Sequence, residues 1–115
     1  MERKVNKFLG DMHKFSKEDD YFSFFYKSKT HVMINLTLSS SKKNNYTYED
    51  LCRKLSPKFS SRSTIQSILN EGCNRKYFEK IVNTTDKREK YFKLNYITKK
   101  KLEMWVNRQK EIFSY

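Results

Sequence analysis

The order of helices and strands predicted between residues 47 and 94 constrains the fold of this 115-residue chain more than any other feature of its sequence. Apolar residues recur at spacings of three and four in two short segments, 47–55 and 61–71. Each spacing predicts a helix with one buried face. Pro57 lies between the two segments and cannot continue a helix, so a turn is expected there.

Two β-strands are predicted after the second helix, at 78–82 and 91–94. The segment between them, residues 83–90, is polar and charged and is longer than a tight two-residue hairpin loop. A hairpin with such a loop is expected to protrude from the domain. Helix, turn, helix and protruding hairpin is the order of a winged helix-turn-helix, which we predict over residues 47–95.

Several residues at the expected helix ends are suited to capping. Thr47 can cap the first helix, and Asp50, three residues later, can complete a capping box. Ser60 or Ser61 is expected to cap the second helix. Gly72 is expected to weaken or end that helix, because glycine is a poor helix former.

The segments on either side of this region are also expected to be mainly helical. Residues 2–15 carry apolar side chains at helical spacing, and Thr98 is expected to cap a last helix with one apolar face. Residues 21–26 are mostly aromatic, which is too apolar for an exposed surface and predicts packing against a partner or in the core. Residues 30–38 fit a strand or a helix, and the local sequence does not decide between them.

The composition favours a mainly helical chain. Only two Gly and one Pro occur, which argues against a loop-rich β-sandwich. A length of 115 residues is typical of one domain with one core. We therefore predict a single domain over residues 1–115, mainly α with a small antiparallel β-hairpin.

Positive charge is concentrated in the predicted helix-turn-helix region. The chain has a formal net charge of +12, and residues 53–101, with 14 Lys and Arg against 4 Asp and Glu, account for +10. The absence of alanine and the abundance of Lys and Asn indicate an AT-rich genome, so a single lysine says little about function. Charge confined to one structural unit says more, because DNA phosphates are attracted to such a surface. Double-stranded DNA is the expected partner.

The second helix of a helix-turn-helix presents its N-terminal residues to base edges in the major groove. Arg can bond guanine O6 and N7, Gln and Asn can pair with adenine, and Ser or Thr can reach bases or phosphates. The predicted base-reading residues are Arg62, Ser63, Thr64, Gln66, Ser67 and Asn70. The alternative is a polar face turned to solvent; the position of this helix after a first helix and a Pro-containing turn favours DNA reading.

The loop at 83–90 is predicted to touch DNA beside this helix. Lys87, Arg88 and Lys90 can reach phosphates or a minor groove, where an arginine suits a narrow A-tract. Asp86 can hold the Arg88 guanidinium in place. The remaining predicted backbone contacts, with plain surface charge as the alternative for the basic ones, are Ser61, Lys58, Arg75, Lys76 and Lys93.

Neither an enzyme nor a metal or cofactor site is expected. Cys52 and Cys73 lack a CxxC or Cys/His pattern, and His13 and His31 are expected in packing or on the surface. No catalytic motif is present. No apolar stretch approaches the ~20 residues of a transmembrane helix, and the N-terminus lacks a signal-peptide core. The expected location is the cytoplasm, in association with the nucleoid.

Residues 29–113 resemble the MarR-like winged-helix transcriptional regulators. Thr47-Tyr-Glu-Asp-Leu-Cys-Arg-Lys-Leu55 looks like the first motif helix of that family, and Ser61-Arg-Ser-Thr-Ile65 looks like the start of its recognition helix. Thr85-Asp-Lys-Arg88 is similar to its Asp-x-Arg wing signature. The sequence departs from the family at Gly72, where a large apolar residue is usual.

The resemblance implies a homodimer, because members of this family are joined through their N- and C-terminal helices. The corresponding dimerisation segments are 1–27 and 98–115, and the resemblance also favours a helix for the ambiguous segment. Effectors bind in related regulators, but the sequence names none. Four aromatic residues can line such a pocket at the dimer interface or, as the alternative, form its apolar core: Phe8, Phe15, Trp105 and Phe113.

The predicted function is sequence-specific binding of double-stranded DNA by a homodimeric transcriptional regulator. The helix at 61–71 would lie in the major groove and the loop at 83–90 at the minor groove. One alternative is a non-specific architectural or replication-associated DNA-binding protein. A second alternative is a winged helix used as a protein-interaction module.

Overall fold

The computed structural model describes residues 1–40, 46–82, 85–86 and 88–114. Helices and strands occur there in the following order: α1 (Glu2–Glu18), α2 (Asp20–Phe25), α3 (Lys29–Ser40), β1 (Tyr46–Thr47), α4 (Tyr48–Leu55), α5 (Arg62–Asn74), β2 (Phe78–Val82), β3 (Lys90–Leu94) and α6 (Tyr96–Phe113). The structure confirms the mainly helical fold with a small antiparallel sheet, and it settles the ambiguous segment 30–38 as helix.

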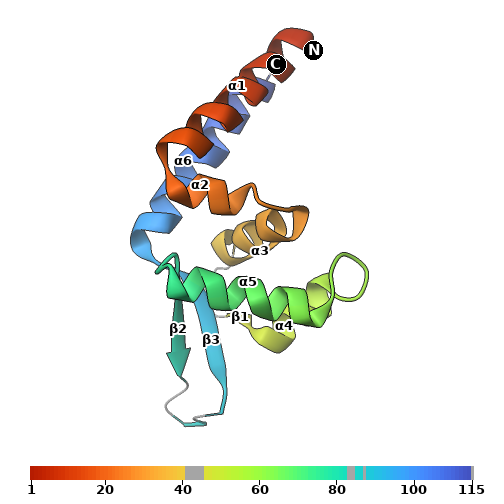
Figure 1. Cartoon of the computed structure of the whole chain (residues 1–115), viewed down its shortest axis with the longest axis vertical. Helices are drawn as coiled ribbons and strands as arrows, with labels where there is room; N and C mark the ends of the chain where they lie inside the picture. Colours follow the sequence, from red (N-terminus) through yellow and green to blue (C-terminus); the bar gives the residue numbers. More distant parts are fainter. Residues whose placement is uncertain (41–45, 83–84, 87, 115) are drawn as a thin grey trace.

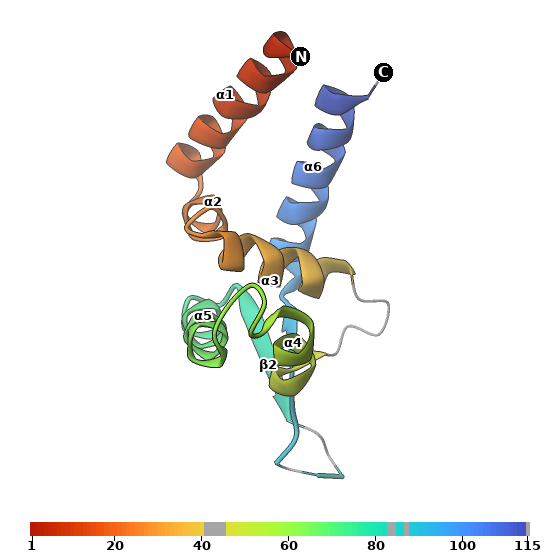
Figure 2. The same ribbon diagram turned by 90° about the vertical axis from the view of Figure 1, so that its right-hand side faces the viewer.

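The elements are arranged in three levels along the long axis of a molecule that measures 51 × 29 × 26 Å (Figure 1). At one end α1 and α6 form an arm that carries both chain termini. The arm leads into a central level of α2 and α3, and α4, α5 and the sheet lie below them. The β2–β3 hairpin protrudes at the far end (Figures 1 and 2). The hairpin and the arm therefore point in opposite directions.

The core is built around the aromatic segment of α2, which is one of the two placements that the sequence leaves open. Tyr21, Phe22, Phe24 and Phe25 are all buried, and they pack among residues from every other helix of the central and lower levels and from the sheet. The Tyr21 hydroxyl donates a 2.7 Å hydrogen bond to Asn35 Oδ1 on α3. Burial raises the pKa of Tyr21, so this hydroxyl keeps its proton and remains a donor.

The sheet has three strands in the order β1-β3-β2, whereas the sequence predicts only the hairpin. β2 and β3 pair antiparallel from Phe78 with Leu94 to Val82 with Lys90. β1 adds Tyr46 opposite Phe92 on the other side of β3. A two-residue strand has no periodicity that a sequence pattern could reveal. β1 fixes the start of α4 against the base of the hairpin.

The predicted caps of α4 and α5 are confirmed. Thr47 and Asp50 form a complete capping box, in which each side chain accepts a 3.0 Å hydrogen bond from the other residue's backbone N–H. The bond from the Thr47 backbone lowers the pKa of Asp50. Ser61 caps α5 by accepting from the Thr64 N–H at 3.2 Å. Both helices of the predicted helix-turn-helix are therefore fixed locally at their N-termini.

The predicted cap of the last helix is wrong. Asn95 caps α6, because its Oδ1 accepts a 2.7 Å hydrogen bond from the Thr98 N–H. The helix thus begins at Tyr96, and Thr98 lies inside the first turn with its side chain buried. Asn is at least as good a cap as Thr, and here it also bonds back to the turn after α5 through the Lys76 carbonyl.

Gly72 is expected to weaken or end the second helix, and the expectation that it ends the helix is wrong. α5 continues through Gly72 to Asn74. The Phe78 ring lies against the glycine so closely that a Cβ at residue 72 would be 2.2 Å from Phe78 Cδ2. Glycine therefore serves the packing of β2 on α5 and does not terminate the helix.

Candidate nucleic-acid interface

α5 divides its side chains between the core and the surface as a recognition helix requires. Ile65, Ile68 and Leu69 are buried. The predicted base-reading residues lie on the remaining surface, where Gln66 is half-buried and the others are exposed: Arg62, Ser63, Thr64, Ser67 and Asn70. α5 is thus anchored on one side and open along the other.

Hydrogen bonds organise part of this open surface. The Ser61 hydroxyl bonds to Thr64 Oγ1 at 2.8 Å, so the Thr64 hydroxyl takes part in the cap. Further along, Gln66 Nε2 donates to Asn70 Oδ1 at 3.0 Å. These contacts restrain side chains that would otherwise have to be ordered when a ligand binds, which lowers the entropic cost of binding.

Arg62, the first residue of α5, is held against α4. Its guanidinium forms an ion pair with Glu49 and lies over the Tyr48 ring, 5.3 Å from the ring centroid. The Tyr48 hydroxyl donates a 3.0 Å hydrogen bond to the Arg62 carbonyl. The Glu49 hydrogen bond raises the pKa of Arg62 further above its ordinary value, at which an arginine is already a cation. Glu49 and Tyr48 were not identified from the sequence as neighbours of this arginine.

A groove of about 680 Å³ lies where α4, α5 and the hairpin meet. Its charged lining comprises four cations, Arg53, Lys80, Arg88 and Lys90, and three carboxylates, Glu49, Asp50 and Glu89. Arg53 and Lys80 were missed by the sequence analysis. The alternation of side chains along β2 could have placed Lys80 on this face of the sheet. Lys80 pairs with Phe92 on β3, and its Nζ lies 6.0 Å from the centroid of the Phe92 ring.

In the hairpin, Arg88 and Asp86 are paired as the sequence predicts. Arg88 Nε lies 3.5 Å from Asp86 Oδ1, which also accepts a 3.0 Å hydrogen bond from the Arg88 backbone N–H. The Arg88 side chain is 94% exposed. Lys90 is the first residue of β3, so the loop ends one residue earlier than predicted. The predicted contact Lys87 lies outside the described residues.

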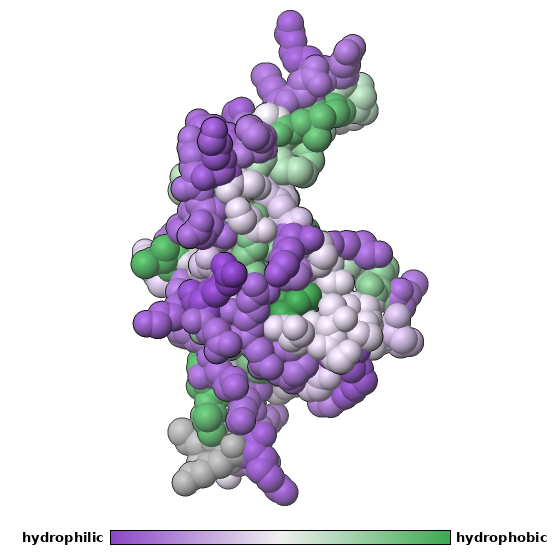
Figure 3. Space-filling view, viewed as in Figure 1, coloured by the Kyte–Doolittle hydropathy of each residue, from purple (hydrophilic) through white to green (hydrophobic). Residues whose placement is uncertain are grey.

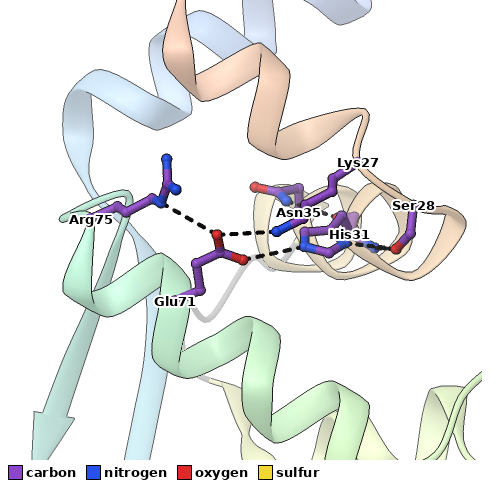
Figure 4. A network of polar contacts seen from close by, with 6 residues as sticks. All are labelled: Lys27, Ser28, His31, Asn35, Glu71 and Arg75. Atoms are coloured by element: carbon purple, nitrogen blue, oxygen red, sulfur yellow. Dashed lines mark hydrogen bonds and ion pairs between the residues drawn. The ribbon is translucent and has the colours of Figure 1, made fainter.

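The other predicted backbone contacts do not come together. Lys58 lies in the exposed turn between α4 and α5, near the start of α5. Arg75 and Lys76 follow the opposite end of α5. Arg75 Nε pairs with Glu71 Oε2 at 3.3 Å, on the side of α5 that faces α2 and α3 (Figure 4). The structure therefore places Lys58 beside the candidate surface and turns the Arg75 side chain away from it.

Glu71 is the centre of a polar network that joins α5 to α3 (Figure 4). His31 is buried, with Nδ1 2.6 Å from the Ser28 hydroxyl and Nε2 3.5 Å from Glu71 Oε1. Lys27 approaches Glu71 Oε2 at 3.5 Å. Burial lowers the pKa of His31, although Glu71 acts in the opposite direction. The network links α5 to the level that carries the arm.

We expect the free energy of unfolding to fall as the pH decreases from about 7 to 5, in part because of His31. Its pKa is lower in the folded chain than the value of about 6.5 for an exposed histidine, so the unfolded chain takes up the proton first. Urea denaturation at several pH values checks this for the wild type, His31→Gln and His13→Gln, a control that removes an exposed imidazole. His31→Gln should show the weaker pH dependence; equal slopes for the two variants would contradict the assignment.

The described residues contain neither a candidate metal site nor a helix able to cross a membrane. No group of three or more His, Cys, Asp or Glu side chains in the described part of the chain is arranged to hold a metal ion. No helix there is long and apolar enough for a membrane span. Cys52 is buried and Cys73 is half-buried, and both are free thiols.

Comparison with known proteins gives matches by structure but none by sequence. No protein-family model and no curated protein matches this sequence. The fold is similar to that of a mutant of MepR from S. aureus, with a TM-score of 0.66, 17% identity, and coverage of 94% of this chain and 77% of that one. A structure of the S. aureus MepR–DNA complex gives a TM-score of 0.66 at 15% identity, with coverage of 93% and 86%. AdcR, an adhesin competence repressor from Streptococcus pyogenes, gives a TM-score of 0.61 at 17% identity, with coverage of 96% of this chain and 74% of that one.

These neighbours are MarR-family regulators, and their resemblance spans nearly the whole of this chain. The chain therefore has the winged-helix fold of MarR-like regulators, as the sequence motifs indicate. Because the sequence identities are only 15–17%, the structural similarity establishes the fold alone.

Proposed function

We propose that this chain is a homodimeric transcriptional regulator that binds double-stranded DNA in a sequence-specific manner. In this proposal α5 enters the major groove and presents Arg62, Ser63, Thr64, Gln66, Ser67 and Asn70 to base edges. The β2–β3 hairpin reaches the neighbouring minor groove with Arg88. Such a protein would act in the cytoplasm, on the nucleoid.

The observation that carries the proposal is the combination of an anchored helix with a polar open face and a protruding hairpin beside it. Arg62 begins α5, and the exposed Arg88 lies on the hairpin. Both belong to a region with a net charge of +10. The structural neighbour MepR has been solved in complex with DNA, on the same fold. Phosphates would supply affinity, and the α5 side chains would supply selectivity.

The dimer is inferred from the arm. α1 contains no buried residue, although its sequence is amphipathic. Val5, Leu9, Met104 and Phe113 are large apolar side chains that remain exposed on α1 and α6. Hydrophobic surface is visible along the arm in Figure 3. A second copy of the chain would cover it, since exposed apolar patches mark interaction surfaces. Phe8 and Phe113, whose ring centroids lie 6.0 Å apart, fit the interface core better than a ligand pocket.

Selection of preferred sites from a random duplex pool tests the function most directly. A homodimer predicts a pseudo-palindrome whose half-sites are about one helical turn, ~34 Å, apart. The best site should exceed random DNA in affinity by ~10³ or more, whereas a preference under about tenfold would favour an architectural protein. Failure to bind any duplex at low salt would contradict both and point to a protein-interaction module. Sedimentation of the same sample measures the oligomeric state.

A further inference from the structure

The candidate DNA-binding surface carries more negative charge than the sequence suggests. Three of its arginines each have a carboxylate partner: Arg53 with Asp50, Arg62 with Glu49, and Arg88 with Asp86. The groove between α4, α5 and the hairpin has three carboxylates against four cations, in a chain with 13 acidic and 25 basic side chains. Carboxylates at this position would repel DNA phosphates.

Of these carboxylates, Glu49 is the one that contacts a predicted base-reading residue, Arg62. It lies 13 residues before Arg62 and belongs to the first turn of α4, so the fold alone brings the two together. The Glu49 side chain is 59% exposed and the Arg62 side chain is 53% exposed. An exposed ion pair is weak, because water screens it. Arg62 is therefore held next to Glu49 by an interaction that a stronger acceptor can replace.

We propose that Glu49 is a specificity-determining residue that competes with DNA phosphates for Arg62. This inference rests on the proposed function and concerns how the same site discriminates among sequences. When Arg62 leaves Glu49 for a phosphate, one exposed ion pair is exchanged for another, and a carboxylate remains facing the backbone. Random DNA thus gains little from Arg62.

When Arg62 leaves Glu49 for a correctly placed guanine, the ion pair is replaced by hydrogen bonds to a neutral base. Its O6 and N7 atoms accept two parallel hydrogen bonds from one guanidinium. Guanine carries no net charge for the Glu49 carboxylate to repel, whereas every phosphate does. The Tyr48 contacts keep the start of α5 and the Arg62 guanidinium near α4, and so restrict where the side chain can reach. Glu49 therefore reduces non-specific binding more than specific binding.

The test is Glu49→Gln, which removes the charge and keeps the shape. Without its competitor, Arg62 becomes available to one additional phosphate. Affinity for random duplex should then rise about eightfold at 0.1 M salt, and the slope of log affinity against log salt should steepen by about 0.9, the value for one phosphate contact. Affinity for the selected site should change less, so the ratio of specific to non-specific affinity falls.

Glu79→Gln is the matched control. Glu79 is 50% exposed on β2 and lies 3.5 Å from Lys93, so the variant breaks a comparable ion pair and makes the same change in net charge. Glu79 lines a separate cavity with Leu38 and Leu94, away from the groove between α4, α5 and the hairpin. Its effect measures the general consequence of one lost carboxylate.

A double-mutant cycle with Arg62→Ala separates action through Arg62 from simple repulsion. In the Arg62→Ala background, Glu49→Gln should change the salt slope no more than Glu79→Gln does. Equal effects of Glu49→Gln and Glu79→Gln in the wild-type background would overturn the inference, and so would an undiminished effect of Glu49→Gln without Arg62. Circular dichroism and melting curves verify that the variants fold. A wild-type chain that binds no duplex would instead refute the proposed function.

Discussion

Replacing Gly72 with alanine is expected to lower the free energy of unfolding by up to about 2 kcal/mol. Overpacking a close-packed site costs about 1–3 kcal/mol, and the better helix propensity of alanine, about 1 kcal/mol, offsets part of that. A Cβ at residue 72 would be 2.2 Å, 2.4 Å and 2.8 Å from three atoms of the Phe78 ring. The ring cannot easily yield, because it is 2% exposed and packs against Phe24 with centroids 5.7 Å apart.

Gly10→Ala provides the matched control within the same chain. Gly10 lies within α1, and a Cβ there would meet no atom within 4 Å. The same substitution should therefore stabilise the protein by about 0.5–1 kcal/mol. Thermal denaturation at equal protein concentration compares the two, with an expected fall in Tm for Gly72→Ala of roughly 4–8 °C for each kcal/mol lost. If Gly72→Ala melts at or above the wild-type temperature, the close packing of Phe78 on α5 is not tight enough to require glycine.

Arg62→Ala is expected to relax sequence preference at one base pair of the selected site. A bidentate contact to guanine contributes about 1–3 kcal/mol of discrimination, which corresponds to roughly a five- to 150-fold loss at that position. Affinity for random duplex should change less. Competition binding with single-base variants of the selected site measures the loss position by position.

Lys76→Ala is the comparison for this experiment. Lys76 is exposed at the opposite end of α5, so its loss should weaken binding to all sequences by a similar factor or leave it unchanged. Identical effects of Arg62→Ala and Lys76→Ala across the whole set of duplexes would mean that the base-reading residues are wrongly assigned.

The sequence predicts those parts of the structure that depend on short-range chemistry. The capping box of Thr47 and Asp50, the cap at Ser61 and the Arg88–Asp86 pair each involve residues two or three positions apart. The aromatic segment of α2 reveals its burial by composition alone. The helix-turn-helix and hairpin follow from these local signals and from apolar periodicity.

What the sequence does not predict depends on contacts between distant segments. β1 exists only because Tyr46 and Thr47 find partners on β3. Asn95 caps α6, although Thr98 could cap a helix equally well by its local chemistry. Gly72 leaves room for the ring of Phe78, six residues later, and does not end the helix. The pairing of Arg62 with Glu49 likewise requires the turn to return α5 alongside α4.

The position of Trp105 gives this protein an optical signal at the junction between its arm and its core. Trp105 is the single tryptophan of the chain, its ring lies 5.0 Å from that of Phe25, and its Nε1 donates a 2.5 Å hydrogen bond to the Tyr26 hydroxyl. Indole fluorescence responds to the polarity around the ring and to hydrogen bonding at its nitrogen. Emission from the unlabelled protein therefore reports whether α6 is seated on α2, and it follows that contact in the presence or absence of DNA.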